Sequence, residues 1–391
     1  MRSASPSVDR GPAAPAAAPS PARLTVELRR DLDLPPDDDV AFAALLESRP
    51  PVAVFLSKAW LSGLFAEPPE GFAPSLAVLR EGGALRGVAP LAVRHAPTHV
   101  RVALLGGGAG SDRTDLLAAP GHEALCADAL LSWLGEAFGR GFVLELRDVP
   151  AESPLWGAVR RASAGRSPRL TLQPREIHAL PVLALPAAAS GAGLAPVHPR
   201  SLEKHRRWLE RRGRLRIDLL EDPGEVMAAF TTLTGFLHAR WRDHPSGSAL
   251  DHPRAQRFHR QALPRLLVEG RLRMIRLSAD LRTVAVYYGL ASGRWWGYYL
   301  AGYDRDWAGR IHLGQVALAA AVDLASREGA AEFDFLKGVE PVKYLWPVRE
   351  RVTLDADVHS GHGGAQLDRA VRAAREAAAG LVKAARGVFA R

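Results

Sequence analysis

The succession of hydrophobic periods over residues 272–346 constrains the fold of this 391-residue chain more than any other feature. Three runs rich in β-branched and aromatic residues come first, each of strand length: 272–278, 283–291 and 294–301. A turn-rich loop at 302–310 then leads into an alanine-rich stretch of helical character at 313–328, and a last strand covers 331–336. A sheet whose middle strand feeds a loop that opens a helix accepts anionic ligands, because the first N–H groups of a helix lack partners within it. The order therefore indicates a transferase that grips a phosphate-bearing donor.

The N-terminal half repeats this order of elements. Its periodicity predicts three strands, a loop, a helix and a further strand, at 75–80, 84–93, 100–105, 122–138 and 142–146. The two halves share almost no sequence identity, so the repeat is one of pattern only. It predicts an α/β protein with mixed sheets, built as two similar domains in tandem.

Composition sets the expected limits of the domains. The first residues are rich in Ala, Pro and Ser, and a stretch rich in Pro, Ala and Gly separates the two halves. We therefore expect a disordered lead at 1–22, an N-terminal domain at 23–180, a linker at 181–199, a C-terminal domain at 200–358 and a basic amphipathic helix at 363–391.

The net charge of +9 is concentrated in two segments. Residues 200–216 carry +6 and residues 363–391 carry +4, so the rest of the chain is close to neutral. This distribution argues against DNA binding over a broad face and leaves local contact with a polyanion such as tRNA open. The apolar seam of the C-terminal helix can dock on the protein itself, on a partner or on an anionic membrane surface.

The single cysteine, Cys126, lies in an apolar helical run and fits a packed thiol better than a nucleophile. One cysteine excludes an internal disulfide framework, and the N-terminal segment lacks the hydrophobic region of a secretory signal. We expect a cytoplasmic protein, with a peripheral position at the inner membrane left open by the C-terminal helix.

Several stretches match a known family in order and spacing over about 300 residues. They include FLSKAW at 55–60, GVAPL at 87–91, the glycine-rich run ending at Asp112, LHARW at 237–241, YLAGYD at 299–304, FDFLKG at 333–338 and EPVKYLW at 340–346. The chain resembles the GNAT-like acyltransferases of the CelD/BcsL type, associated with cellulose biosynthesis and distantly related to the FemAB peptidyltransferases. The resemblance implies two tandem GNAT-like domains. It also implies acyl transfer from an acyl-CoA-type thioester to an amine or hydroxyl of a sugar or envelope precursor.

Two positions depart from the family pattern. Val342 stands where the family usually has a Tyr before the matching lysine, Lys343. The stretch 310–315 offers one glycine, at shifted spacing, in place of the glycine-rich pyrophosphate loop of GNAT acetyltransferases.

The resemblance also implies a donor site. The strand at 294–301 would splay from its neighbour and expose a backbone N–H that stabilises an oxyanion, and the following helix would receive the phosphates. The expected donor-binding residues are Leu300, Ala301, Gly302, Arg310, Leu313, Gly314 and Gln315. The alternative is that Gly302 and Gly314 serve turn geometry and helix packing only.

Three residues are candidates for catalysis. Asp334 points opposite to its two Phe neighbours and could accept a proton, but a structural carboxylate satisfied by loop N–H groups is the favoured alternative. His238 titrates near neutral pH, but a packing role in its helix is the alternative. Tyr299 is the third candidate and lies at the expected splay. The expected substrate-binding residues are Asp112, Trp241, Lys343 and Trp346, and surface ion pairs are the alternative for Lys343.

Sequence signatures of nucleotide binding and of metal binding are excluded by the residues around them. The glycine run at 106–110 follows a strand, but it neither opens a helix at once nor carries a Gly-Lys-Ser/Thr sequence, which excludes a dinucleotide fingerprint and a P-loop. His359 and His362 lack companions at metal-ligand spacing, so no metal is expected.

Two rival functions stay open: aminoacyl transfer from charged tRNA of the FemAB kind, and a non-catalytic module that holds a polysaccharide precursor.

Overall fold

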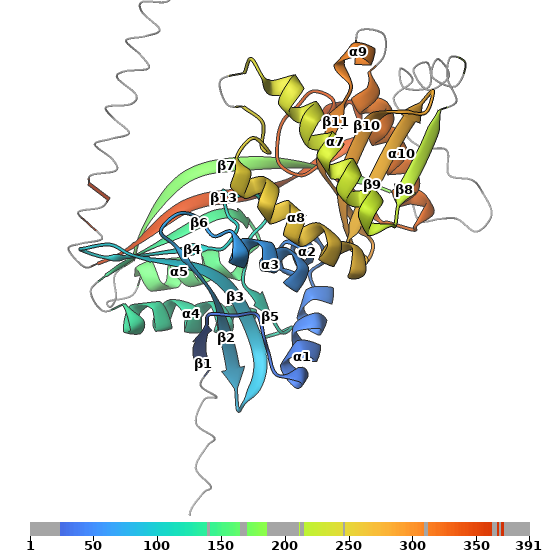
Figure 1. Ribbon diagram of the computed structural model, residues 1–391. Helices are drawn as coiled ribbons and strands as arrows, with labels where there is room; N and C mark the ends of the chain where they lie inside the picture. The colour runs from blue at the N-terminus through green and yellow to red at the C-terminus, as the bar shows by residue number, and fades with distance from the viewer. Residues whose placement is uncertain are drawn as a thin grey trace, which may run out of the picture.

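One mixed sheet of 13 strands runs through both lobes of the computed structural model (Figure 1). The structure describes residues 24–138, 141–164, 170–185, 211, 215–244, 247–308, 312–361, 366 and 369–370. The hydrogen-bonded strand order is β1-β2-β3-β4-β6-β13-β7-β12-β11-β10-β9-β8, with β5 paired to β3. The observed fold is the mixed α/β fold that the sequence predicts.

The N-terminal lobe contains β1 (Thr25–Arg29), α1 (Pro36–Glu47), α2 (Pro50–Leu56), α3 (Lys58–Ala66), β2 (Ala73–Glu81), β3 (Ala84–His95), β4 (Val100–Leu104), β5 (Leu117–Ala118), α4 (Glu123–Ala137), β6 (Phe142–Pro150) and α5 (Pro154–Ala164). The C-terminal lobe contains β8 (Arg216–Leu220), α7 (Pro223–Trp241), α8 (Pro253–Val268), β9 (Leu272–Ala279), β10 (Arg282–Ser292), β11 (Trp295–Tyr303), α9 (Arg305–Ala308), α10 (Leu313–Arg327), β12 (Glu332–Asp334) and the short 3-10 helix η1 (Lys343–Leu345).

Two long strands, β7 (Leu170–Ala184) and β13 (Val348–Ser360), join the lobes (Figure 1). They pair with each other over almost their whole length. β13 is last in the sequence, yet its second half pairs with β6 of the N-terminal lobe, and the end of β7 pairs with β12 of the C-terminal lobe. Each lobe therefore borrows a strand from the other half of the chain, which fixes their relative position.

Side-chain alternation along the strands divides the core into layers. In β10, Val286 and Tyr288 face a core shared with α1, α2, α3, α7 and α8, whereas Ala285 and Tyr287 face α10. On the opposite face of the N-terminal sheet, α4 and α5 cover a third cluster. The shared core, in which Trp60 of α3 packs edge-on against Phe258 of α8, extends across both lobes.

The predicted strands and helices of both halves are present, with ends shifted by one to a few residues. The expected linker at 181–199 differs at its start, because residues up to Ala184 belong to β7, where they pair with β12 and β13. The division into domains at 23–180 and 200–358 stays a prediction. The strands β7 and β13 extend across the predicted boundary, because each pairs with strands of both lobes. The lead, most of the basic segment at 200–216 and most of the C-terminal helix at 363–391 lie outside the described residues.

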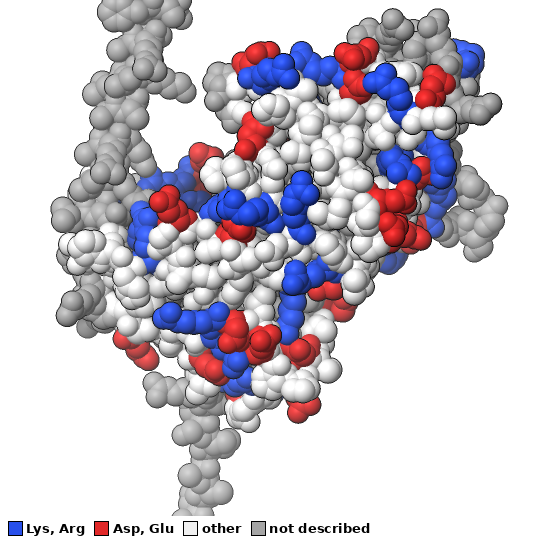
Figure 2. Space-filling view, in the orientation of Figure 1, with Lys and Arg blue, Asp and Glu red and all other residues white. Residues whose placement is uncertain are grey.

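The described surface carries interspersed positive and negative side chains on both lobes (Figure 2). Cys126 is a buried free thiol in α4, and burial raises its pKa to about 11, as expected for a packing residue. In the part of the chain described here, none of the helices is long and apolar enough to span a bilayer.

Candidate functional site

The pairing of β11 with β12 stops after three positions and leaves a wedge between the two strands. The parallel register runs from Trp295↔Glu332 to Gly297↔Asp334. Beyond it, β11 continues to Tyr303, and the described residues include no strand paired to that edge. Since successive backbone N–H groups of a strand point to opposite edges, about half of those in residues 298–303 face this wedge.

A β-bulge in β11 lies at the same place. Opposite β10, Tyr288 pairs with Leu300 and Gly289 pairs with Tyr298, so Tyr299 has no partner in the register. The extra residue turns Tyr299 and Leu300 toward the same core, whereas Tyr298 and Tyr303 pack against the core on the other face. The bulge thus bends the strand where its edge becomes free.

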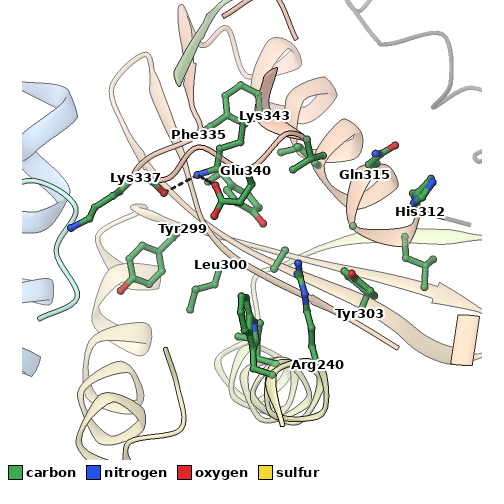
Figure 3. A pocket seen from close by; sticks show the side chains of 18 residues that line it. Arg240, Tyr299, Leu300, Tyr303, His312, Gln315, Phe335, Lys337, Glu340 and Lys343 are labelled. Carbon is green, nitrogen blue, oxygen red and sulfur yellow. Dashed lines mark hydrogen bonds and ion pairs between the residues drawn. The ribbon is translucent and has the colours of Figure 1, made fainter. Parts of the chain in front are cut away.

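A cavity of about 380 Å³, called here the donor cavity, opens in this wedge (Figure 3). It is formed by residues of α7, β11, the first turn of α10 and the loop after β12. The lining residues are Leu237, Arg240, Trp241, Tyr298, Tyr299, Leu300, Ala301, Tyr303, His312, Leu313, Gly314, Gln315, Leu318, Phe335, Lys337, Glu340, Val342 and Lys343. Its volume lies in the range of small-molecule sites.

One end of the donor cavity is the N-terminus of α10. His312 is the N-cap and makes no capping hydrogen bond with its side chain, and its carbonyl accepts the N–H of Gln315 at 2.9 Å. Among the described residues, the N–H groups of Leu313 and Gly314 have no hydrogen-bond acceptor. A Cβ on Gly314 would lie 3.1 Å from the Tyr303 ring, so glycine allows close packing here. Free N–H groups of an α-helix at a cavity wall form a site for an anion.

Arg240 supplies a positive charge to the same wall. Its guanidinium lies 5.5 Å from the Trp241 ring centroid and 5.3 Å from that of Tyr303. Stacking on two aromatic rings holds a cation in place while leaving its N–H groups available. Figure 3 shows Arg240 rising from α7 toward Tyr303, with His312 and Gln315 beyond it.

At the other end of the donor cavity, Lys343 holds the loop that follows β12. Its side chain is 3% exposed, and its Nζ donates to the carbonyls of Leu336, Lys337 and Gly338 at 3.4, 2.8 and 3.5 Å. An ion pair with Glu340 at 2.9 Å completes its surroundings (Figure 3). Lys343 lines the cavity, but these partners make it a group that positions the loop rather than a free charge for substrate.

Lys337 joins the two lobes. Its Nζ lies 2.7 Å from Oδ1 of Asp148 in β6, and its N–H donates to Oδ2 of Asp112 at 3.2 Å. The Asp148 carboxylate also accepts the N–H of Gly108 at 2.9 Å. Burial and the nearby Asp148 charge raise the pKa of Asp112 to about 6. Asp112 does not line the donor cavity itself, but its raised pKa and its contact with Lys337, which does, make it a candidate proton acceptor.

A possible metal cluster lies behind Lys337. Ligand atoms of Asp148, His178 and Asp355 lie within 4.8 Å of one another. The Lys337 ammonium already compensates Asp148, so we assign no metal to this cluster.

Tyr299 faces both lobes. It lines the donor cavity, and its hydroxyl donates to the carbonyl of Gly110 at 2.7 Å. Burial is the main reason that its pKa lies well above the usual value, with smaller contributions from Tyr288 and Asp112. Tyr299 therefore stays protonated at neutral pH.

The structure brings most of the predicted donor and substrate residues together. Leu300, Ala301, Leu313, Gly314 and Gln315 line the donor cavity, as do Trp241 and Lys343. Asp112 reaches the site through the backbone of Lys337, and Arg310 lies outside the described residues.

Four predicted residues lie elsewhere. Asp334 is fully buried and accepts from Trp295 Nε1 and the N–H of Leu336 while pairing with Arg113 at 2.6 Å, and these contacts favour the structural alternative. His238 is exposed and pairs with Asp251 at 3.2 Å. Gly302 packs under Phe236 and Leu233 of α7, and Trp346 packs beside Phe335 without lining the donor cavity.

Four aromatic and cationic residues that line the donor cavity are not among the predicted site residues. They are Arg240, Tyr298, Tyr303 and His312. The strand alternation of Tyr298 and the position of Arg240 beside Trp241 carried a usable signal, but their convergence depends on α7 crossing the end of β11.

Comparison with known proteins agrees with this geometry. Residues 198–344 match the profile of the acetyltransferase (GNAT) domain family. None of the curated proteins compared matches the chain. Among solved structures, that of FemX superposes with a TM-score of 0.56 at 12% identity, covering 85% of this chain and 96% of FemX.

Two further solved structures show the same fold. A conserved protein of unknown function from Bacteroides thetaiotaomicron has a TM-score of 0.51 at 12% identity, covering 84% of this chain and 98% of its own. The C-terminal domain of a putative lysylphosphatidylglycerol synthetase from Agrobacterium fabrum has a TM-score of 0.51 at 11% identity, covering 86% and 95%. The family match over residues 198–344 identifies the C-terminal half as an acetyltransferase (GNAT) domain, and the protein as an acyltransferase.

Proposed function

We propose that the protein transfers an acyl group from an acyl-CoA-type thioester, bound in the donor cavity, to an amine or hydroxyl of an acceptor. The observation that carries this proposal is the end of the β11–β12 pairing at Gly297 and Asp334, which opens a cavity beside a free strand edge. We further propose that the protein is of the CelD/BcsL type and modifies a sugar or envelope precursor, on the stretches that resemble that family.

The two ends of the donor cavity would bind different parts of the acyl donor. Phosphate groups would lie against the N–H groups of Leu313 and Gly314, with Arg240 as a nearby cation. The acyl carbonyl would lie at the bulge, where the backbone N–H groups around Leu300 stabilise the negative charge that develops on its oxygen.

The proposed proton acceptor is Asp112. The described residues give its Oδ1 no hydrogen-bond partner, while Oδ2 is held by the Lys337 N–H. With a pKa of about 6, it is mostly ionised at pH 7 and can take a proton from the attacking amine or hydroxyl. The acceptor atom then bonds to the carbonyl carbon, and the C–S bond breaks as the tetrahedral intermediate collapses.

The proposed proton donor to the leaving thiolate is Tyr299. Its raised pKa keeps it protonated, and a rotation about the Cζ–Oη bond would turn its hydrogen from Gly110 toward a sulfur bound beside it. No covalent enzyme intermediate is required, which agrees with the burial of Cys126 in the core of the N-terminal lobe.

A thermal-shift panel tests the proposal. The full-length protein is melted with acetyl-CoA, longer acyl-CoA thioesters, free CoA and charged tRNA. A ligand present at about 100 times its Kd should stabilise the fold by roughly 2.7 kcal/mol. Stabilisation by CoA thioesters supports the proposal, and stabilisation by none of them contradicts it.

An aminoacyl ester is the second candidate donor. FemX shares the fold over 85% of this chain, and such a donor also presents an activated carbonyl beside phosphates. Stabilisation by charged tRNA alone, weakening steeply as salt is raised, would favour this candidate over acyl-CoA.

A further inference from the structure

The side chain of Asp334 replaces the next hydrogen bond between β12 and β11. The N–H of Phe335 donates to the carbonyl of Pro181 in β7 at 2.8 Å. Because successive N–H groups of a strand point to opposite edges, the N–H of Leu336 would face β11 if β12 continued. Oδ1 of Asp334 accepts that N–H at 2.9 Å instead. The carboxylate thus takes the donor that would extend the ladder, and the two strands separate at this point, called here the fork.

Beyond the fork the chain turns in a left-handed conformation. Leu336 has a φ of +55° although it is not a glycine, and its side chain is buried. Its two neighbours, Phe335 and Lys337, line the donor cavity (Figure 3). The N–H of Gly338 then donates to the carbonyl of Ala179 at 3.4 Å, so the loop stays beside β7 and away from β11. The turn at Leu336 therefore sets the width of the wedge.

An arginine of the N-terminal lobe holds the carboxylate at the fork. Nη2 of Arg113 lies 2.6 Å from Oδ2 of Asp334, and the two side chains are 3% and 0% exposed. The indole N–H of Trp295, in β11, donates to the same oxygen at 3.2 Å. A buried ion pair often stabilises a fold no more than packed apolar side chains would, but it fixes the orientation of the carboxylate.

Arg113 is itself anchored to the N-terminal lobe. The next residue, Thr114, donates its N–H to the carbonyl of Asp148 at 3.0 Å and its hydroxyl to that of Arg147 at 2.6 Å. Nη1 of Arg113 donates to the carbonyl of Pro51 at 3.4 Å. These contacts tie the arginine to β6 and to the start of α2, so the position of the N-terminal lobe is transmitted to the fork.

We propose that Arg113 is a positioning residue for acyl transfer. By holding the Asp334 carboxylate on the N–H of Leu336, it sets the separation between β11 and the loop after β12, where the donor thioester binds. Arg113 does not line the donor cavity, so the N-terminal lobe controls the geometry of that cavity without contact with the donor. The inference rests on the proposed function, because it concerns the same cavity.

Replacement of Arg113 tests the inference. Arg113→Met removes the charge and keeps an apolar stem, and Arg113→Lys keeps the charge should the first variant fold poorly. Arg175→Met is the matched control. It also breaks an ion pair of a fully buried carboxylate, that of Asp357 at 2.6 Å, but near the end of β7 that lies away from the fork.

Two ligands separate the wedge from the helix end of the donor cavity. Calorimetry measures the affinity for CoA, whose pantetheine arm would occupy the wedge, and for 3′-phosphoadenosine 5′-diphosphate, which is CoA without that arm. Amide hydrogen exchange over residues 298–303 and 335–338 reports on the fork without any ligand. Binding is measured in place of turnover because Asp112, the proposed proton acceptor, is adjacent to Arg113 in the sequence.

In Arg113→Met the affinity for CoA should fall by at least about ten-fold, with unchanged affinity for the nucleotide and faster exchange in both segments. Arg113→Lys should show the same pattern with a smaller loss, and Arg175→Met should match the wild type.

Unchanged CoA affinity in Arg113→Met, an equal loss for both ligands, an equal loss in Arg175→Met, or wild-type exchange at the fork would each overturn the inference and leave the proposed function standing. A wild type that binds no CoA contradicts the proposed function. In that case, faster exchange confined to the two segments in Arg113→Met would still support control of the fork by Arg113.

Discussion

Each lobe contains a corresponding pair of parallel strands, and the donor cavity lies beside the pair of the C-terminal lobe. In the C-terminal lobe the β11–β12 pair ends at Gly297 and Asp334, and β11 continues alone to Tyr303. In the N-terminal lobe the β4–β6 pair ends at Ala103 and Glu145, and β4 stops at the next residue.

The chain itself fills the corresponding space in the N-terminal lobe. Thr114 donates through its N–H to the carbonyl of Asp148 at 3.0 Å and through its hydroxyl to that of Arg147 at 2.6 Å. Gly107 packs so closely that a Cβ there would lie 2.9 Å from the Arg147 side chain. The returning segment thus satisfies backbone groups of β6 beyond its pairing with β4.

This difference separates the N-terminal lobe from the lobe to which we assign the donor. Where the returning loop is glycine-rich and enters the wedge, the wedge closes. Where β11 instead runs on to Tyr303, the wedge stays open beside the N-terminus of α10. The closed loop still serves the open site, because Gly110 anchors Tyr299 and Asp112 holds Lys337.

Closing the open wedge should produce the largest effect. Ala301→Trp places an indole in the donor cavity, so donor affinity and turnover should fall by at least about 100-fold. Calorimetry with CoA and a thiol-release assay measure both. Val40→Trp, at a position of α1 that is 72% exposed, is the control. Unchanged CoA affinity in Ala301→Trp would refute the assignment of this cavity.

Removing the proposed base should have the next largest effect. Asp112→Asn should lower turnover by about 100-fold and abolish the loss of activity that the wild type shows as the pH falls through about 6. The folded protein binds this proton more tightly than the unfolded chain, so ionised Asp112 lowers stability above pH 6. The variant should therefore have a higher Tm than the wild type at pH 7, and a similar Tm at pH 4.

Asp128→Asn, at an exposed ion pair with Arg161, serves as the control for this comparison. An acidic limb that persists in Asp112→Asn would rule out Asp112 as the proton acceptor.

Loss of the lysine that holds the cavity loop should be milder. Lys343→Met removes the ammonium group that donates to the carbonyls of residues 336–338. The loss should lower the free energy of unfolding by about 1–3 kcal/mol and turnover by roughly ten-fold. Thermal denaturation and steady-state kinetics check both values. Glu340→Gln, whose carboxylate is 60% exposed, should change little, and an equal loss in both variants would mean that the ion pair matters more than the carbonyls.

The smallest effect is expected at His238. Neither His238 nor its ion-pair partner Asp251 lines the donor cavity, so His238→Ala should leave turnover unchanged and stability within about 0.5 kcal/mol. A substantial fall in turnover, measured in the same thiol-release assay, would support a catalytic role for His238.

Much of this contrast could be predicted from local sequence. The periods that define β9, β10, β11 and α10 are strong, and the loop before α10 led to Leu313, Gly314 and Gln315, which line the donor cavity. Local patterns succeed here because the free N–H groups are a property of any helix start.

The rest depends on contacts between distant parts of the chain. Asp334 pairs with Arg113 of the other lobe, a partner that alternation along β12 cannot reveal. Lys343 satisfies carbonyls through a turn that the sequence does not specify, and β13 crosses to the N-terminal lobe. These residues were misplaced or only partly understood because tertiary packing, not periodicity, selects their partners.

A crystal structure of the full-length protein with CoA tests the open wedge most directly. The account predicts the pantetheine arm between residues 298–301 of β11 and the loop after Phe335, with phosphate oxygens at the N–H groups of Leu313 and Gly314. CoA bound elsewhere, or an empty donor cavity at a saturating concentration of CoA, would contradict it.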